Sequence, residues 1–494
     1  MSTQVQKAVG KNPSYARPPQ PSSVVPVVPP PPYIPYTSPP TSSLPPPRLP
    51  DRPPIADVPA GWTRTSHIVP AAYPRRFNDS FGSLRRESKP FQLEPPKQGE
   101  TKEERLARNE GEARECLRQR FDARGFENGA AGKGEGLFMA GERWRRDGAS
   151  EGVEGVTLVV THANGFHKES WHPTLRRLLE ADAFDPSDTF GEPALRRTSA
   201  SSSSSTKKTQ VDEIWLFDDV HHAASIDLNA DRIGGVHGWS DGGRDIVNFL
   251  QHVYGSEGEQ YPDQEVLTWR EGKATKRRKV IGVGHSVGGN ALVQAAAEAP
   301  QLFHGIFLVE PMCPAHHPPR STLKLDANFS KVWPLVNAAA RRRSDWPTLD
   351  DAAKVRSSPF YASWHEETWA LYLSHGFVPL PGQDGAVQLA TPAWAEGCVF
   401  AEPTGIAEGW DRLAQLDVPV GFLMAGDSRS TQGDEATARM VWRPKLGSNE
   451  RVMDGGHLLV QEKPDEVADA LHRFIGGLSE GILTVRDVLS QAKM

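Results

Sequence analysis

One stretch decides the fold: VIGVGHSVGGNALVQAAA, residues 280–297. Its first four residues form a short apolar run with β-branched members, which predicts a buried strand, and its alanine-rich end predicts a helix. Between them lies the pentapeptide Gly284-His285-Ser286-Val287-Gly288. Glycines two residues to either side of the serine allow the strand and helix backbones to approach closely. The stretch therefore predicts a tight turn that exposes the Ser286 hydroxyl, as a nucleophile requires.

Further apolar runs alternate with helical segments along the chain. The runs that predict strands are 137–140, 156–160, 214–217, 280–283, 306–309 and 418–424. The segments that predict helices are 174–183, 243–254, 291–297 and 464–474. This alternation predicts an α/β fold with a mostly parallel sheet flanked by helices. Residues 312–415 separate two core strands and contain many tryptophans and prolines, so we expect an inserted lid, or cap, there.

Composition excludes several function classes. The net charge of -6 over 494 residues carries no basic excess, which argues against nucleic-acid binding. The three cysteines, Cys116, Cys313 and Cys398, are far apart and lack metal-ligand spacing, so we expect neither a disulfide framework nor a metal site. No apolar run approaches the roughly 18 residues of a membrane span, and the N-terminus lacks a secretory pattern. We expect a soluble intracellular protein that acts on a small molecule without a cofactor.

A serine hydroxyl is a poor nucleophile unless a base takes its proton. The glycine-containing loop 454–458 precedes a predicted helix near the C-terminus, and its His457 is the predicted base. Two backbone amides must also stabilise an oxyanion, and we expect them at Val287 and at Asn164 in the small-residue loop after the strand 156–160. The alternatives to Asn164 are Gly165 and Phe166.

The acid that orients His457 has two main candidates. Glu310 follows the run 306–309, where an unpartnered carboxylate would be an expensive buried charge. Asp427 follows the run 418–424, but it lies out of register with the usual acid position. Glu310 is favoured, and Asp218 and Asp219 are more remote alternatives.

With these residues placed, the chain resembles the fungal peroxisomal α/β-hydrolases, a group that includes a yeast peroxisomal lipase and hydrolases of fungal toxin biosynthesis. The likeness rests on the stretches 162–168, 214–222, 238–245, 284–288, 302–311 and 455–457. It implies an α/β-hydrolase fold with an inserted lid over about residues 156–474. In that group the serine, a strand-end glutamate followed by proline, and the histidine recur, so the resemblance also favours Glu310 as the acid.

The two ends of the chain carry separate signals. Residues 1–60 are dominated by proline and serine, which predicts an extended, disordered arm. Within the arm, Pro30-Pro31-Pro32-Tyr33 matches the ligands of WW domains, although a solvated arm without a partner is the simpler interpretation. The last residues, Ala492, Lys493 and Met494, are a conservative variant of the Ser-Lys-Leu that the peroxisomal import receptor reads. Together with the resemblance, they predict the peroxisomal matrix, with the cytoplasm as the alternative.

The expected organisation follows from these boundaries. The parts are a disordered proline-rich arm (1–60), a first core part (61–311) with surface insertions near 95–136 and 184–212, a lid (312–415), a second core part (416–485) and a tail (486–494). We expect a lipase- or esterase-like serine hydrolase that cleaves an ester or thioester of a lipidic acyl group through an acyl-enzyme. The alternatives are a catalytically silent scaffold that binds a partner, and a lyase or acyltransferase that uses the same triad.

Overall fold

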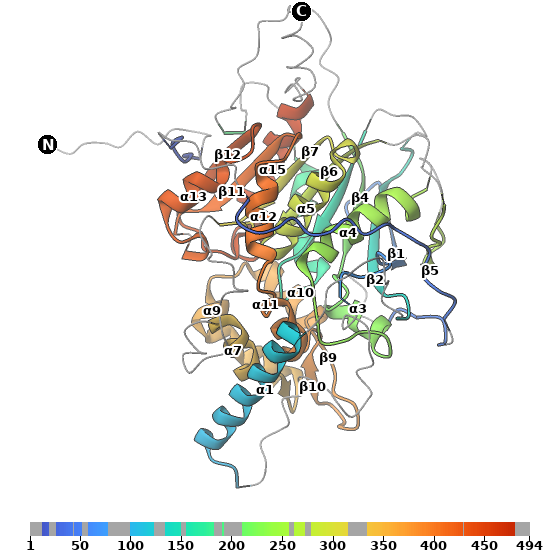
Figure 1. Cartoon of the computed structure of the whole chain (residues 1–494), viewed down its shortest axis with the longest axis vertical. Helices are drawn as coiled ribbons and strands as arrows, with labels where there is room; N and C mark the ends of the chain where they lie inside the picture. Colours follow the sequence, from blue (N-terminus) through green and yellow to red (C-terminus); the bar gives the residue numbers. More distant parts are fainter. Residues whose placement is uncertain are drawn as a thin grey trace, which may run out of the picture.

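A nine-stranded sheet forms the centre of the molecule (Figure 1). The computed structural model describes residues 12–18, 26–42, 44–51, 58–77, 99–122, 134–149, 155–181, 190–191, 210–255, 261–271, 278–314, 333–427 and 429–479. In their order across the sheet, the strands are β12 (Gly447–Val452), β11 (Val420–Ala425), β7 (Gly305–Val309), β6 (Lys279–His285), β3 (Val156–Thr161), β4 (Val211–Phe217), β2 (Phe138–Arg146), β1 (Trp62–Pro70) and β5 (Glu265–Val266). Neighbouring strands run parallel except at β2, which is antiparallel to both β1 and β4. The predicted mostly parallel α/β architecture is confirmed.

Helices cover both faces of this sheet. They are α2 (His172–Glu180), α3 (Ala223–Asn229), α4 (Trp239–Asn248), α5 (Val287–Glu298), α12 (Gly405–Leu413), α13 (Asp434–Val441), α14 (Leu459–Glu462) and α15 (Pro464–Ser479). Successive side chains of β7 point to opposite faces. Ile306 and Leu308 enter the core shared with α4 and α5, and Phe307 and Val309 enter the core shared with α2 and α15. A strand that is buried on both faces has a continuous run of apolar residues. For this reason, such strands could be predicted from the sequence.

The sequence did not predict β12, because its sequence is polar. Its Asn449 and Glu450 are nevertheless buried. The Arg473 side chain of α15 donates to Glu450 at 2.6 Å, and the Tyr15 N–H donates to the Asn449 side chain at 2.7 Å. Partners that are remote in sequence thus satisfy the polar groups of this edge strand.

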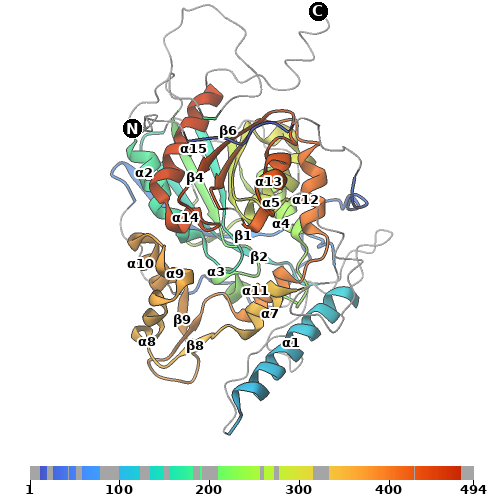
Figure 2. The same ribbon diagram turned by 90° about the vertical axis from the view of Figure 1, so that its left-hand side faces the viewer.

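A cap is inserted between β7 and β11. Its elements are α7 (Pro334–Arg341), β8 (Asp345–Trp346), α8 (Leu349–Ala353), α9 (Pro359–Ala362), α10 (Glu366–His375), β9 (Phe377–Pro379), β10 (Val387–Leu389) and α11 (Ala393–Phe400). They lie together beside one end of the sheet (Figure 2). The helix α1 (Lys102–Asp122), expected as a surface insertion, packs against α7 and α11 of this cap. By contrast, α12 packs against α5 and α4, so the segment 405–413 joins the core layer although we expected it in the lid.

The proline-rich arm differs from the expected disorder in the segments that the structure describes. They are extended, but Tyr15, Val28 and Ile34 are buried against the domain. The arm also covers the sheet edge, because the Arg451 N–H of β12 donates to the Pro13 carbonyl at 2.7 Å. Composition shows that a segment lacks a core of its own, but it does not show that a few apolar side chains fit the surface of a neighbour.

Some predicted features cannot be compared with the structure. The C-terminal residues Ala492, Lys493 and Met494 lie outside the described residues, as does most of the insertion near 184–212. Among the helices that are described, none combines the length and apolarity needed to cross a lipid bilayer.

Candidate active site

The turn between β6 and α5 has an unusual backbone at Ser286, with φ 57° and ψ -118°. Residues other than glycine rarely adopt a positive φ, and such strain persists only where the surroundings enforce it. The Ser286 N–H donates to the Val309 carbonyl at 3.0 Å. The Ser286 carbonyl accepts from the N–H groups of Asn290 and Met312, each at 3.1 Å. Hydrogen bonds to two neighbouring segments therefore hold the predicted turn in its strained form.

The two glycines of the pentapeptide are required by close packing. A Cβ atom on Gly284 would lie 2.7 Å from the Leu292 side chain and 2.8 Å from Thr161 Oγ1. A Cβ atom on Gly288 would lie 2.5 Å from the His162 carbonyl oxygen. Real Cβ contacts essentially never reach such distances. The spacing of the motif thus reflects the approach of β6 and α5 to β3 and to the loop that follows it.

A chain of hydrogen bonds connects Ser286, His457 and Glu310. The Ser286 Oγ lies 3.0 Å from His457 Nε2, and His457 Nδ1 lies 3.0 Å from Glu310 Oε2. In this arrangement His457 carries its proton on Nδ1, where it donates to Glu310, and its Nε2 accepts from the serine hydroxyl. The His457 carbonyl also accepts from His285 Nε2 at 2.8 Å. Burial, together with the neighbouring His457, lowers the pKa of His285 to about 3, so His285 stays neutral and anchors the loop.

Glu310 is fully buried but well supplied with donors. Its Oε1 accepts from the Ala425 N–H at 2.7 Å, and its Oε2 accepts from the Ser430 hydroxyl at 2.8 Å in addition to His457. These bonds compensate for removing the carboxylate from water. They also fix its orientation toward the histidine.

The alternative acids lie elsewhere. The Asp427 side chain is 70% exposed and forms an ion pair with Arg429 at 3.2 Å. Asp218 is buried and binds the Lys168 ammonium at 3.1 Å. Asp219 accepts from the side chains of His222 and His237. The geometry thus favours Glu310 as the partner of His457.

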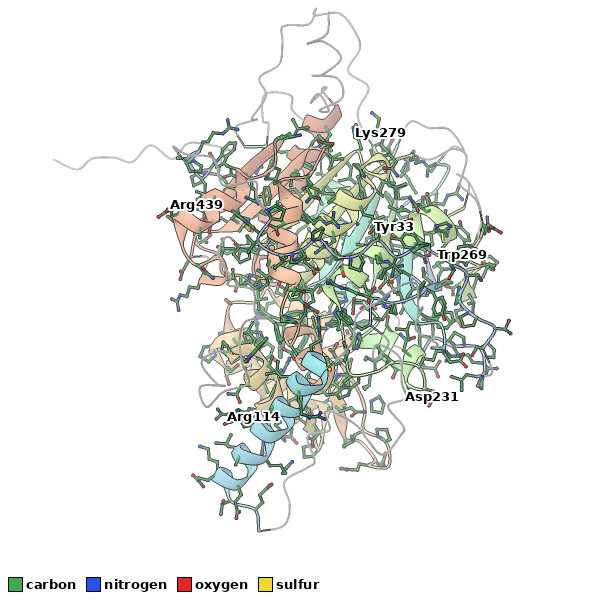
Figure 3. All side chains as sticks on the ribbon, in the orientation of Figure 1. Tyr33, Arg114, Asp231, Trp269, Lys279 and Arg439 are labelled. Carbon is green, nitrogen blue, oxygen red and sulfur yellow. The ribbon has the colours of Figure 1, made fainter. Side chains whose placement is uncertain are left out.

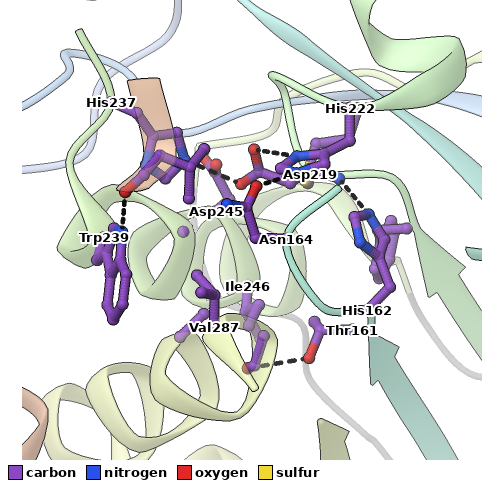
Figure 4. Close-up of a pocket in the computed structure, with 16 residues that line it drawn as sticks. Thr161, His162, Asn164, Asp219, His222, His237, Trp239, Asp245, Ile246 and Val287 are labelled. Carbon is purple, nitrogen blue, oxygen red and sulfur yellow. Dashed lines mark hydrogen bonds and ion pairs between the residues drawn. The ribbon is translucent and has the colours of Figure 1, made fainter. Parts of the chain in front are cut away.

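Both expected oxyanion donors, Val287 and Asn164, line a pocket beside the Ser286 turn (Figure 4). Val287 is the first residue of α5, where N–H groups have no carbonyl partner within the helix. The Asn164 side chain accepts from His222 Nε2 at 2.9 Å and donates to the Glu396 carbonyl of the cap at 3.2 Å. The alternative donor Phe166 already donates its N–H to Ala163 at 3.2 Å. Asn164 therefore sits in a loop that is tied to the core on one side and to the cap on the other.

The pocket combines an apolar and a polar wall. The apolar side chains are Met139, Phe217, Trp239, Ile246, Val287, Ala291 and Val399, and the polar ones include Asn164, Asp219, His222, His237 and Asp245. The cap tryptophans do not line this pocket. Trp346, Trp364 and Trp369 form a cluster with Phe166, which lies in the loop after β3 that also contains Asn164. The cap thus contacts the site mainly through that loop, while the core supplies most of the pocket.

The sequence indicates Asp219 only as a remote alternative for the acid and predicts no role for the histidines that form a polar cluster around it. Figure 4 shows Asp219 between His222 and His237. Its carboxylate lies 3.2 Å from His222 Nδ1 and 3.3 Å from His237 Nε2. Burial would raise the pKa of Asp219, but His237 and the hydrogen bonds from both histidines hold it well below its usual value. Burial and His237 lower the pKa of His221, so that ring stays neutral. The run of acids and histidines directly after a buried strand was the available signal, because ligands gather at that end of parallel sheets.

The same cluster contains the one group of potential metal ligands among the residues described. Ligand atoms of Asp219, His221 and His237 lie within 4.8 Å of one another. The His221 N–H and the His237 side chain both donate to Asp219, and the His221 and His237 rings pack edge to face, which accounts for this proximity without an ion. We interpret the cluster as a support for the loop that contains Asn164, since His222 also binds the Asn164 side chain.

Comparisons with known proteins agree with this architecture. The alpha/beta hydrolase family model matches residues 158–470. An abhydrolase domain-containing protein of Alternaria alternata, AFT2-1, is 25% identical over 40% of this chain and 84% of its own length. The peroxisomal membrane protein LPX1 of Saccharomyces cerevisiae is 27% identical over 36% of this chain and 35% of its own length.

Two further similarities concern a structure and an enzyme. The crystal structure of Saccharomyces cerevisiae Lpx1 aligns with 88% of this chain and 96% of its own, with a TM-score of 0.57 at 15% identity, which shows the shared fold. A type I acyl-CoA thioesterase of Penicillium brevicompactum, mpaH, is 23% identical over 41% of this chain and 35% of its own length. The fungal resemblance seen in the sequence is confirmed, and the chain belongs to the alpha/beta hydrolase family.

Proposed function

We propose that this chain is a serine hydrolase that cleaves carboxylic esters or thioesters through an acyl-enzyme on Ser286. The observation that carries the proposal is the hydrogen-bond chain from the strained Ser286 through His457 to the buried Glu310. Such a chain activates a hydroxyl that would otherwise be a poor nucleophile.

The geometry supports a two-step reaction. His457 Nε2 takes the proton as Ser286 Oγ attacks the carbonyl carbon, and Glu310 stabilises the imidazolium that forms. The amides of Val287 and Asn164 stabilise the oxyanion. His457 then returns the proton to the leaving alcohol or thiol, and water repeats the sequence to release the acid and restore Ser286.

Two observations bear on the substrate. The apolar wall of the pocket begins at Val287, directly beside the reacting serine, and suits an acyl chain. The Penicillium brevicompactum relative is an acyl-CoA thioesterase by name, which supports testing thioesters together with esters. We therefore include lipidic acyl thioesters in the proposed substrate class.

A fluorophosphonate probe and the variant Ser286→Ala test the mechanism. The wild type should be labelled and should hydrolyse p-nitrophenyl esters or acyl-CoA thioesters, and Ser286→Ala should lose both properties. Ser357→Ala, which removes an exposed cap serine, is the matched control and should behave as the wild type. Hydrolysis at the wild-type rate by Ser286→Ala would disprove the mechanism, and a folded wild type that is never labelled would favour the silent scaffold.

We further propose import into the peroxisomal matrix through Ala492, Lys493 and Met494. The peroxisomal protein LPX1 among the relatives supports this location. A fluorescent protein that carries the last residues of this chain should enter peroxisomes of a fungal cell, and deletion of the final three residues should leave it in the cytoplasm. Equal distribution of the two fusions would contradict the proposal.

A further inference from the structure

The arm segment that contains the proline motif is buried with a period of three residues. Val28 is 7% exposed, Pro31 is half-buried and Ile34 is 2% exposed. The residues between them, Pro29, Pro30, Pro32, Tyr33 and Pro35, are exposed. Proline fixes an extended backbone with three residues per turn, so every third side chain lies along the same edge. One edge of this extended helix therefore faces the domain, and the other two face outward.

The domain holds both ends of this segment. The Asp411 carboxylate of α12 accepts from the N–H groups of Val27 and Val28 at 2.7 and 3.0 Å. Farther along, the Arg244 side chain of α4 donates to the Ile34 carbonyl at 3.2 Å, and the Thr37 N–H donates to the Tyr73 carbonyl at 3.0 Å. The segment runs across the layer of α12, α5 and α4 (Figure 1). Because it is already ordered, a partner that binds it loses little further conformational entropy.

The outward edge carries an unusual side chain. Tyr33 is 71% exposed, more than any other large apolar side chain among the described residues, and Figure 3 shows it on the helix layer facing the viewer. Pro30 precedes it by one turn, so the proline ring and the tyrosine ring lie along the same edge. Tyrosine is among the residues that are enriched at protein–protein interfaces relative to the rest of the surface.

We propose that the docked arm presents Pro30 and Tyr33 to a WW-type domain. Such a domain grips a proline ring between aromatic side chains and reads a preformed polyproline helix. Residues 26–42 contain no charged side chain, so recognition must rest on proline and tyrosine rather than on an ion pair. The proposed surface belongs to the helix layer and shares no residue with the pocket beside Ser286, so binding leaves the active site open.

Calorimetry of the full chain tests this surface. The probe is a purified WW domain that binds free Pro-Pro-x-Tyr peptides, and the reference ligand is a synthetic peptide of residues 26–42. The affinity of the WW domain for the full chain should lie within about threefold of its affinity for the peptide, because the docked arm already exposes Pro30 and Tyr33. Tyr33→Ala in the full chain should weaken binding at least tenfold and leave its thermal unfolding unchanged.

Pro32→Ala is the matched control, since Pro32 is exposed but lies on the other outward edge. It should change the affinity less than threefold, whereas Pro30→Ala should weaken binding as Tyr33→Ala does. A full chain that fails to bind while the peptide binds would overturn the proposal, because the docked arm would then hide the motif. Retained binding by Tyr33→Ala would overturn it as well.

Discussion

Replacing Glu310 with glutamine should reduce kcat about 10²- to 10³-fold and change KM little. The carboxylate lies 3.0 Å from His457 Nδ1 and faces the imidazolium that forms in the transition state. Two unit charges about 4 Å apart interact with about 4 kcal/mol at an effective dielectric constant near 20. Each 1.36 kcal/mol corresponds to tenfold in rate, which gives about 10³-fold, and the 30% exposure of the His457 side chain reduces that value.

The amide also fits the site poorly. Both oxygens of Glu310 accept hydrogen bonds, from Ala425 at one and from Ser430 and His457 at the other. In either orientation a glutamine would point an N–H group at one of these donors. Leaving that donor unsatisfied adds about 1–3 kcal/mol of destabilisation, so the thermal midpoint should fall while the fold persists.

Steady-state kinetics on any ester that the wild type cleaves measure the effect. Asp427→Asn is the matched control, because an exposed ion pair contributes about 0–1 kcal/mol, and its kcat should change less than threefold. Circular dichroism establishes that both variants are folded. If Glu310→Gln kept a kcat within tenfold of the wild type, or if Asp427→Asn lost more activity, the assignment of Glu310 would be wrong.

Three further predictions use the oxyanion loop and the turn. Asn164→Ala removes both side-chain bonds of the loop but keeps its backbone amide, so kcat should fall about tenfold or more, and the buried His222 donor left without a partner should lower the free energy of unfolding by about 1–3 kcal/mol. Gly288→Ala should destabilise by about 1–3 kcal/mol in urea unfolding through overpacking, whereas Gly111→Ala in α1, with open space around it, should be neutral or stabilising by up to about 1 kcal/mol. Burial and His222 lower the pKa of His162 to about 4 from about 6.5, so the unfolded chain binds the proton more tightly between these values. His162 should therefore contribute about 3 kcal/mol to the loss of stability as the pH drops from 6.5 to 4, in addition to the other buried histidines, and His162→Asn should remove that share; an equal slope in the variant would contradict it.

How well the sequence predicts this fold depends on where each strand finds its partners. The strands β6, β7 and β11 are covered on both faces, so their own residues record their burial. The edge strand β12 buries Asn449 and Glu450 against Tyr15 and Arg473, which come from opposite ends of the chain. A local sequence pattern does not indicate partners that are distant in the chain. For the same reason, the composition of the arm did not predict that the arm docks on the domain.

The candidate site divides in the same way. Ser286 and His457 stand in glycine-containing turns whose geometry is local, so short motifs indicate them. The choice between Glu310 and Asp427 depends on which carboxylate faces His457, and that is a property of the assembled sheet. The spacing of residues in the sequence likewise does not predict the hydrogen bond from His222 to Asn164, because the two residues come from loops that follow different strands.

The order of the strands explains how a carboxylate after β7 reaches His457. β7 lies between β6, which leads into Ser286, and β11, which precedes Asp427. Glu310 directly follows β7 with φ 46°, and its own N–H donates to the Leu423 carbonyl of β11 at 3.0 Å. The end of β11 supplies the Ala425 N–H to Glu310 Oε1, so this strand contributes a donor to the carboxylate. The end of β11 and the Ser430 hydroxyl in the loop after it both donate to Glu310, so this loop contributes donors to the carboxylate while its own acid, Asp427, lies in solvent.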